Sequence, residues 1–466
     1  MNDLSLEKFF YASKITVFGV ADEPTNMAKN VIYNLQEMGF EGDIYPVGRK
    51  AGKTFGKSIV TNPESLPDDI DLAVILVPRK GVAETLDICG RKGVRHAVVS
   101  TGGFSEFDDE DNQYEKETLH VAKKYGIRLI GPNCLGVYCT DSKVCTAFNP
   151  IRPKAYKKGP VSLIIQSGGV TTQCAYTFSD EYIGFSKLIS VGNKLDVNEI
   201  ELMKYLLNDP ATEQIHLYLE SIEDGQELMR LAKSSPKPIV LLKANLSQIA
   251  APIAKSHTAA LYNNDRIVDC SARQAGMIRV QNIHEMTVCA KAFRLPPLKG
   301  ERLAVISMSG GFSVVLGDVC EKYGFQCPAL PQSLIDQIES KRRGGIIRMS
   351  NPMDTGDIHE LQALEFIIEQ CLNLNDIDGA VISFVWDSRL TEIMGSAQIT
   401  YDLVLAFFQS ICDRVKKPIS LSFIAERREI DKFKKVNTFP VFNTPEESVQ
   451  ALSFLRTYWE QREASS

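Results

Sequence analysis

The stretch Val161-Ser-Leu-Ile-Ile-Gln-Ser-Gly-Gly169 decides the fold. Its apolar first half is typical of a buried strand, and the Ser-Gly-Gly behind it opens a helical pattern. The same order returns at Arg302-Leu-Ala-Val-Ile-Ser-Met-Ser-Gly-Gly311, again with a helical segment behind it. A buried strand that turns sharply into a helix is the repeating unit of a parallel α/β sheet. The two stretches therefore predict α/β architecture in two separate parts of the chain.

Each Ser-Gly-Gly turn also carries binding chemistry. It exposes free backbone N–H groups at the positive end of a helix dipole, and glycine lets an anion approach the backbone closely. Such a turn suits a phosphate or a carboxylate, although tight turns between a strand and a helix use glycine in any case. We predict six phosphate-binding positions at the two turns: Ser167, Gly168, Gly169, Ser309, Gly310 and Gly311.

His257 is one of only six histidines and lies in a segment with no clear strand or helix pattern. The segment follows the apolar run 238–243, which reads as a strand. A histidine in such a place can reach a pocket built by other elements, as a nucleophile or proton carrier must. A lone histidine is more often a satisfied surface or core residue. Together with two anion-binding turns, however, His257 favours a role in the transfer of a phosphoryl group.

The rest of the chain alternates apolar runs with helical stretches. Runs such as 72–77 are apolar on both faces, which is typical of a parallel sheet covered by helices. Proline-containing segments at 149–160 and 296–300 read as linkers. We predict an α/β chain of three consecutive Rossmann-like or flavodoxin-like parallel-sheet domains, at 1–150, 160–295 and 300–466. In the first domain we expect strands at 15–19, 44–47, 72–77, 96–100 and 129–130, and helices at 28–38 and 82–92.

Composition narrows the class of protein. The 466 residues carry a net charge of −6 with no basic stripe, which argues against nucleic-acid binding. Eleven cysteines without a Cys-x-x-Cys pair indicate reduced thiols and neither a disulfide framework nor a metal site. The N-terminus lacks the features of a signal peptide, and no apolar run approaches the length of a membrane span. We therefore expect a cytoplasmic protein that binds neither nucleic acid nor a membrane.

The first domain shows nucleotide-type chemistry. The strand at 15–19 leads through Ala21 toward a helix, where a dinucleotide fold holds its pyrophosphate. Only Gly19 of the Gly-x-Gly-x-x-Gly fingerprint is present, which disfavours NAD(P) and a nicotinamide-dependent dehydrogenase. Another nucleotide, such as CoA, could use the same crevice. Three further strand ends carry turn residues that could line it: Val77-Pro78, Thr101-Gly102 and Asn133-Cys134.

Several motifs resemble those of one known family. These are Ser13-Lys-Ile-Thr-Val-Phe-Gly19, Gly131-Pro-Asn-Cys-Leu-Gly136, Ser190-Val-Gly-Asn-Lys-Leu-Asp196, Leu217-Tyr-Leu-Glu220 and Asn351-Pro-Met-Asp354. They resemble the nucleoside-diphosphate-forming acyl-CoA synthetases, relatives of succinyl-CoA synthetase. The resemblance runs through essentially the whole chain. It is strongest to the alpha chains of the ADP-forming acetyl-CoA synthetase type.

The resemblance implies a ligase that forms carbon–sulfur bonds and works reversibly. In this family phosphate converts an acyl-CoA into a carboxylic acid and CoA by way of an acyl phosphate, and a histidine carries the phosphoryl group to a nucleoside diphosphate. His257 aligns with that histidine, and Glu220 aligns with the glutamate that supports it. The implied partner is an ATP-grasp beta subunit, in an α2β2-like hetero-oligomer. That subunit would hold Mg²⁺ and ADP or ATP (or GDP or GTP).

The resemblance also implies a separate role for each of the three predicted domains. The first is expected to bind CoA, with Arg49 and Lys50 supplying positive charge for the CoA phosphates and with Asn133 and Cys134 near the thiol end. The second is expected to carry the phosphohistidine loop. The third is implied to be a second flavodoxin-like domain of the CoA-ligase type.

The loop around His257 departs from the family pattern Ser-His-Thr-Gly-Ala-Leu-Ala-Gly. Ala259 and Tyr262-Asn263-Asn264 replace its glycines. A non-catalytic protein of the same fold that senses CoA or acyl-CoA therefore stays open as an alternative. The identity of the acid also stays open, since the sequence fits acetate-like, branched and aromatic acids alike.

Overall fold

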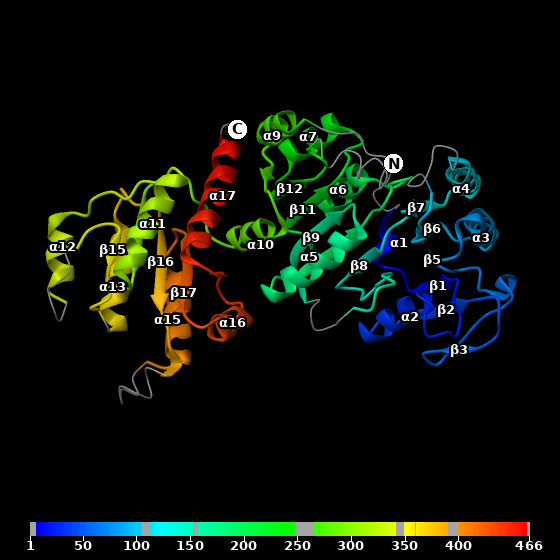
Figure 1. Cartoon of the computed structure of the whole chain (residues 1–466), viewed down its shortest axis with the longest axis horizontal. Coiled ribbons are helices and arrows are strands. Elements are labelled where there is room, and N and C mark those ends of the chain that lie inside the picture. Colours follow the sequence, from blue (N-terminus) through cyan, green and yellow to red (C-terminus); the bar gives the residue numbers. More distant parts are fainter. Residues whose placement is uncertain are drawn as a thin grey trace. The chain divides into compact units, whose positions relative to one another are not determined.

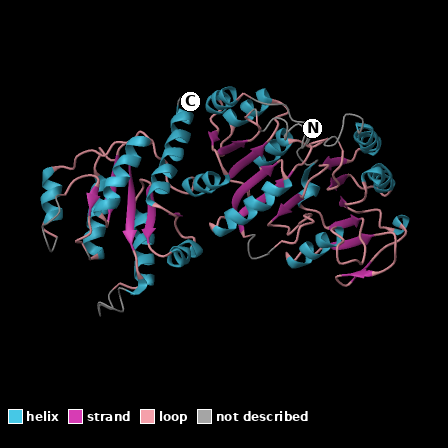
Figure 2. Ribbon diagram, viewed as in Figure 1, coloured by secondary structure: helices cyan, strands magenta, loops and turns pink. Residues whose placement is uncertain are grey.

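The computed structural model describes residues 6–104, 112–151, 157–247, 249, 264–341, 349–358, 360–389 and 399–463. The chain forms two compact units, residues 1–283 and residues 284–466. The first unit contains two large sheets and a short hairpin, and the second contains one sheet (Figure 1). Helices and strands alternate along both units (Figure 2).

The first sheet has five parallel strands in the order β2-β1-β5-β6-β7. All four residues of β5 are buried, as expected for a strand covered on both faces. The strands are β1 Lys14–Phe18, β2 Asp43–Val47, β5 Leu72–Ile75, β6 His96–Val99 and β7 Arg128–Ile130. The other elements are α1 Glu7–Phe10, α2 Ala28–Glu37, the hairpin of β3 Lys53–Thr54 and β4 Lys57–Ser58, the 3₁₀ turns η2 Pro63–Ser65 and η3 Arg79–Gly81, α3 Val82–Arg91 and α4 Asn112–Tyr125.

The second sheet has six strands in the order β13-β12-β11-β9-β10-β8. Its strands are parallel except for β8, which pairs antiparallel with β10 at the edge. The strands are β8 Gly136–Cys139, β9 Lys158–Ile165, β10 Phe185–Ser190, β11 Gln214–Leu219, β12 Ile239–Lys243 and β13 Ile278–Arg279. The helices are α5 Gly168–Asp180, α6 Glu199–Asn208, α7 Gly225–Ser234 and α9 Asp265–Gln274.

The sheet of the second unit has five parallel strands in the order β15-β14-β16-β17-β18. They are β14 Leu303–Ser307, β15 Met353–Asp354, β16 Gly379–Val385, β17 Ile419–Ile424 and β18 Val441–Phe442. The helices are α10 Ile283–Ala292, α11 Gly310–Lys322, α12 Gln332–Glu339, α13 Leu361–Asn373, α15 Tyr401–Arg414, α16 Arg427–Val436 and α17 Pro445–Glu463.

Side chains at the helix starts explain where several helices begin. Each of five residues accepts a hydrogen bond from a backbone N–H of the first turn, which satisfies a donor that the helix itself cannot use. These N-cap residues are Ser167, Asn198, Asp224, Asn264 and Thr400.

The predicted α/β class with parallel sheets is confirmed. In the first sheet, the strands and the two helices begin and end within two residues of the predicted positions. The largest difference is at 72–77, where β5 ends at Ile75 and the last two residues belong to the loop that follows. The expected linker at 149–160 also differs, because β9 already begins at Lys158.

The two sheets of the first unit share one hydrophobic core. Phe10 of α1 stacks on Tyr205 of α6, with 5.0 Å between the ring centres. Strand β8 falls within 1–150, the range expected for the first domain, but it adds to the edge of the second sheet. The division of this unit into domains at 1–150 and 160–295 stays a prediction.

Across the described ranges, no helix has both the length and the apolar character that spanning a membrane would require.

Candidate functional site

The Ser167 turn, residues Ser167 to Gly169, lies where β9 ends and α5 begins. Ser167 caps α5, with its Oγ accepting from the Val170 N–H at 3.4 Å. No acidic side chain occupies the first turn of α5, and Gly169 is exposed. The positive end of the helix dipole therefore faces outward without a carboxylate of its own first turn, as an anion site requires.

Glu220 lies beside this turn, because it follows β11 and β11 pairs with β9. The Gln166 side chain joins the two loops. Its Oε1 accepts from the N–H groups of Glu220 and Ser221, at 2.8 and 2.9 Å, and its Nε2 donates to Ser221 Oγ at 3.0 Å. The structure thus brings the predicted supporting carboxylate and the predicted phosphate turn together at one edge of the sheet.

The Glu220 carboxylate is partly exposed and accepts a hydrogen bond from the Tyr218 hydroxyl, at 3.4 Å. Burial, reinforced by the negative charge of Glu220, raises the pKa of Tyr218. Tyr218 therefore remains a protonated donor at neutral pH and holds one side of the carboxylate.

Two buried lysines hold the backbone around Glu220, and neither was predicted. Lys243 Nζ, at the end of β12, donates to the Glu220 carbonyl at 2.8 Å. Burial lowers the pKa of Lys243 to about 8, against the opposing charge of Glu220. Lys194 Nζ donates to the Ser221 carbonyl at 3.1 Å and pairs with Glu199 at 2.9 Å. A lysine closing an apolar strand, as Lys243 does, is the sequence signal that could have indicated this role.

His257 lies outside the described residues. The described chain before it continues past the end of β12 at Lys243 to residue 247 and includes residue 249, and the described chain after it resumes at Asn264, before α9. Leu219 pairs with Lys243 in the parallel register of β11 and β12. The chain that continues toward His257 therefore leaves the sheet next to Glu220.

The second turn, Ser309 to Gly311, begins α11 in the other unit. Ser309 makes no side-chain capping bond there. Asp354 lies against the helix start, since its Oδ2 would be 2.6 Å from a Cβ placed on Gly310. The start of α11 therefore already faces a carboxylate. That both turns bind one phosphoryl group stays a prediction.

The predicted nucleotide crevice lies at the carboxyl edge of the first sheet. Gly19 has φ +92°, and a Cβ there would lie 2.1 Å from the Leu76 carbonyl oxygen. Only glycine fits this close approach between the ends of β1 and β5. Arg49 and Lys50 follow the neighbouring strand β2 and are exposed.

Hydrogen bonds connect three further predicted residues of this crevice. Thr101 Oγ1 donates to the Val77 carbonyl at 2.7 Å, and the Asn133 N–H donates to the Thr101 carbonyl at 2.9 Å. Gly102 faces Asn133, whose Oδ1 would be 3.1 Å from a Cβ on the glycine. Pro78 is exposed and Ala21 is partly exposed on the loops that follow their strands.

Cys134 differs from its neighbour Asn133. Its side chain is 3% exposed, and its Sγ lies 3.5 Å from the Val99 carbonyl oxygen. Burial raises the pKa of the thiol to about 12. The side chain therefore faces the core, and only its backbone is available to a ligand.

One loop links the crevice to the Ser167 turn. The Pro132 carbonyl accepts from the Asn193 N–H at 3.0 Å, and the Leu135 N–H donates to Ser190 Oγ at 3.1 Å. Leu135 also packs on the start of α5, because it would lie 3.4 Å from a Cβ on Gly168. The loop at 131–136 thus runs from the crevice of the first sheet to the Ser167 turn of the second.

Comparisons with known proteins agree with this arrangement. Residues 13–140 match a family model described as a CoA binding domain, and residues 158–293 match a model described as a Succinyl-CoA ligase like flavodoxin domain. The solved structure of the dinucleotide-forming acetyl-coenzyme A synthetase 1 of Ca. Korarchaeum cryptofilum, in complex with phosphate and ADP, is similar with a TM-score of 0.85 at 27% identity. The match covers 98% of this chain and 97% of that one.

Curated relatives are similar at the sequence level. The ADP-forming acetate–CoA ligase II of Archaeoglobus fulgidus is 34% identical over 393 residues, or 83% of this chain, and this chain spans 58% of the length of that relative. The alpha subunit of the ADP-forming acetate–CoA ligase I of Pyrococcus furiosus is 30% identical over 463 residues, with 97% of both chains covered. Because the match at this identity runs along nearly the whole of both chains, this chain belongs to the family of the alpha subunits of ADP-forming acetate–CoA ligases.

Proposed function

We propose that this chain is the catalytic alpha subunit of an acid–CoA ligase, which interconverts a carboxylic acid, CoA and ATP with an acyl-CoA, ADP and phosphate. The observation that carries the proposal is that Glu220 lies next to the Ser167 turn, because the Gln166 side chain, just before that turn, accepts from the backbone N–H groups of Glu220 and Ser221. An anion site and a carboxylate that can orient an imidazole are the two fixed parts that a phosphohistidine needs.

In the direction of ATP formation, a phosphate oxygen attacks the thioester carbonyl, the carbon–sulfur bond breaks, and CoA leaves as the thiolate. The product is an acyl phosphate. A ring nitrogen of His257 then attacks phosphorus, and the bond to the acyl oxygen breaks to release the carboxylate. The Glu220 carboxylate accepts a hydrogen bond from the ring N–H and so keeps the other ring nitrogen unprotonated as the nucleophile. The N–H groups of the Ser167 turn stabilise the phosphoryl oxygens during the transfer.

CoA is proposed to bind at the crevice of the first sheet. Gly19, Val77, Thr101, Gly102 and Asn133 bring backbone groups close together there. The exposed cations Arg49 and Lys50 suit the CoA phosphates. The loop at 131–136 would lead the thiol end toward the Ser167 turn.

The nucleotide, with Mg²⁺, is proposed to bind to an ATP-grasp beta subunit in a hetero-oligomer in the cytoplasm. The sequence has no Gly-x-x-x-x-Gly-Lys-Ser/Thr loop for a nucleoside triphosphate. The beta subunit would supply Mg²⁺ to neutralise the nucleotide phosphates. This chain would supply the histidine and the site at which the acyl phosphate phosphorylates it.

Phosphorylation of the chain tests the proposal. The full chain is incubated with γ-labelled ATP and Mg²⁺, with and without the beta subunit, and acid-labile, base-stable label on the chain is counted. We expect label with the partner and none without it. His257→Ala should abolish the label, whereas His120→Ala, on the exposed surface of α4, should keep it. Label that persists in His257→Ala would overturn the assignment.

A further inference from the structure

A fully buried ion pair lies behind the Glu220 turn. Lys194 Nζ and Glu199 Oε2 are 2.9 Å apart, and the two side chains are 1% and 0% exposed. Replacing such a pair by uncharged groups of similar volume is often harmless to stability, because the cost of removing two charges from water offsets their attraction. Stability alone therefore does not account for the pair, and its further contacts indicate another role.

Both members of the pair hold the backbone of the turn that carries Glu220. Lys194 Nζ also donates to the Ser221 carbonyl, at 3.1 Å. Glu199 Oε1, the oxygen that does not face the lysine, accepts from the Glu223 N–H at 2.8 Å. The pair therefore fixes the chain on the C-terminal side of Glu220 at two points.

The backbone of Lys194 has an unusual conformation. Its φ is +58°, in the left-handed region that residues other than glycine seldom adopt. Such a conformation costs free energy and persists where the surrounding structure enforces it, often at a functional site. Here the Asn193 N–H donates to the Pro132 carbonyl and the Leu195 N–H donates to the Gly131 carbonyl, both at 3.0 Å. Two carbonyls of one loop thus hold the chain on both sides of Lys194 and set where its ammonium group lies.

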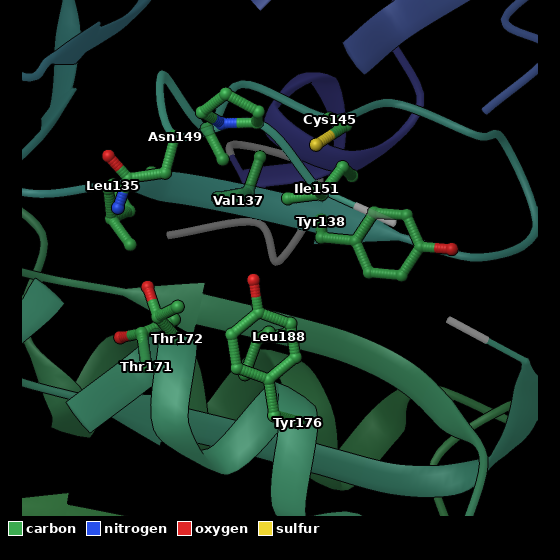
Figure 3. Close-up of a pocket in the computed structure, with 13 residues that line it drawn as sticks. Leu135, Val137, Tyr138, Cys145, Asn149, Ile151, Thr171, Thr172, Tyr176 and Leu188 are labelled. Atoms are coloured by element: carbon green, nitrogen blue, oxygen red, sulfur yellow. The ribbon is translucent and has the colours of Figure 1, made fainter. Parts of the chain in front are cut away.

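The same loop also reaches the start of α5. Its Leu135 lines a small cavity together with Thr171 and Thr172 of that helix (Figure 3). Thr171 Oγ1 in turn donates to the Ser167 carbonyl at 2.8 Å. The segment that carries Lys194 and the helix that begins at Ser167 are therefore supported by one loop.

We propose that Lys194 and Glu199 are positioning residues for the phosphoryl transfer, which keep the Glu220 carboxylate in place beside the Ser167 turn. The inference rests on the proposed function and adds two residues to that site. Neither side chain needs to touch the reacting groups, since both act through the backbone of the Glu220 turn. Misplacing a group at a reacting centre by about 1 Å can lower a rate on the order of a hundredfold, so loss of the pair should be visible in the rate.

The variant Lys194→Met/Glu199→Gln tests the proposal in the complex of the chain with its beta subunit. It removes both charges together and so leaves neither of them buried without a partner. Gln still offers an acceptor to the Glu223 N–H, whereas the Ser221 carbonyl loses its donor. The rate constant for labelling of the chain by γ-labelled ATP is measured by rapid mixing, and CoA affinity by calorimetry. We expect the rate constant to fall at least tenfold and CoA affinity to stay within twofold.

Combining the variant with Glu220→Gln identifies the route of the effect. If the pair acts by positioning Glu220, removing the pair from a Glu220→Gln chain should change the labelling rate constant by less than twofold, because residues that act together are not additive. A pair that acted only on general stability would lower the rate constant by the same factor in both backgrounds. That result, or a fall in CoA affinity as large as the fall in rate, would overturn the proposal.

Lys187→Met/Asp209→Asn is the matched control. This second buried pair has 2.7 Å between Nζ and Oδ2 and side chains that are 0% and 5% exposed. Asp209 precedes β11 and Glu220 follows it, so the two lie at opposite edges of the sheet. The control should label within twofold of the wild-type rate constant, and a loss as large as that of the Lys194 variant would contradict the positioning role.

The wild-type complex separates this inference from the proposed function. Absence of label on the wild-type chain would contradict the proposed function itself. Label on the wild-type chain together with an unchanged rate constant in Lys194→Met/Glu199→Gln would overturn the positioning role alone.

Discussion

Replacing Gln166 by Leu should loosen the Glu220 turn, because this one side chain holds the turn against the start of α5. The Glu220 and Ser221 N–H groups both donate to Gln166 Oε1, and Gln166 is only 3% exposed. Leu has a similar volume but no acceptor, so both donors lose their partner at a cost of roughly 1–3 kcal/mol each. Since Glu220 and Ser221 are partly exposed and water can reach the turn, we expect the lower end of that range, about 2–3 kcal/mol in total.

The variant Gln166→Glu separates the structural effect from the electrostatic one. It keeps an acceptor for both N–H groups but adds a negative charge between Glu220 and the helix start. Because burial and the charge of Glu220 disfavour the ionised form of the new carboxylate, the variant should lose stability as the pH rises through the raised pKa of that carboxyl. Once the carboxyl is ionised, the variant should also lose most of its labelling by ATP, because like charges repel a phosphoryl group. Gln166→Leu should lose stability and labelling together. Unchanged unfolding in Gln166→Leu, or normal labelling in Gln166→Glu, would refute the reasoning.

Three further predictions concern charged residues. Glu220→Gln should slow turnover by roughly ten- to a thousandfold, since it removes the charge that supports a phosphorylated imidazole, while calorimetry should find CoA affinity unchanged. Replacing Arg49 and Lys50 together by Ala should weaken CoA binding and flatten its dependence on salt; an unaltered salt slope would contradict their placement at the CoA phosphates. Burial lowers the pKa of Lys243 from 10.5 to about 8, so the unfolded chain binds more protons between these two values and stability should rise with pH across that window. Urea unfolding at both ends of the window should show this rise in the wild-type protein and lose it in Lys243→Met.

The sheets could be predicted from the sequence because buried parallel strands leave a strong local signal. The run 72–77 is apolar at every position and 161–165 at all but one, and turn residues follow both strands. The error at 72–77 has a physical reason. Leu76 and Val77 are apolar, but they lie at the rim of the crevice, where the Leu76 carbonyl meets Gly19 and the Val77 carbonyl accepts from Thr101. Their side chains are partly buried and pack against the core from the loop that follows the strand.

The support of Glu220 could not be predicted, because it depends on contacts between residues far apart in the chain. Gln166 reaches Glu220 across 54 positions, and Lys194 reaches the Ser221 carbonyl across 27. The pattern of neighbouring residues in the sequence does not indicate which distant residues will form such hydrogen bonds. Cys134 illustrates the same limit at short range, since the sequence places it in the right loop but does not reveal that its side chain turns into the core.

The two Ser-Gly-Gly turns show that an identical tripeptide can have different chemistry. At Ser167 the neighbouring strand contributes Glu220, whose backbone is held by Gln166 and Lys243 and whose carboxylate is partly exposed. At Ser309 the neighbouring strand contributes Asp354, whose carboxylate lies against the first residue of the helix. A negative charge there offsets the positive end of the helix dipole and weakens the attraction for a further anion. We therefore expect the Ser167 turn to be the stronger anion site of the two, because Asp354 ends the strand beside the Ser309 turn with its carboxylate against the helix start.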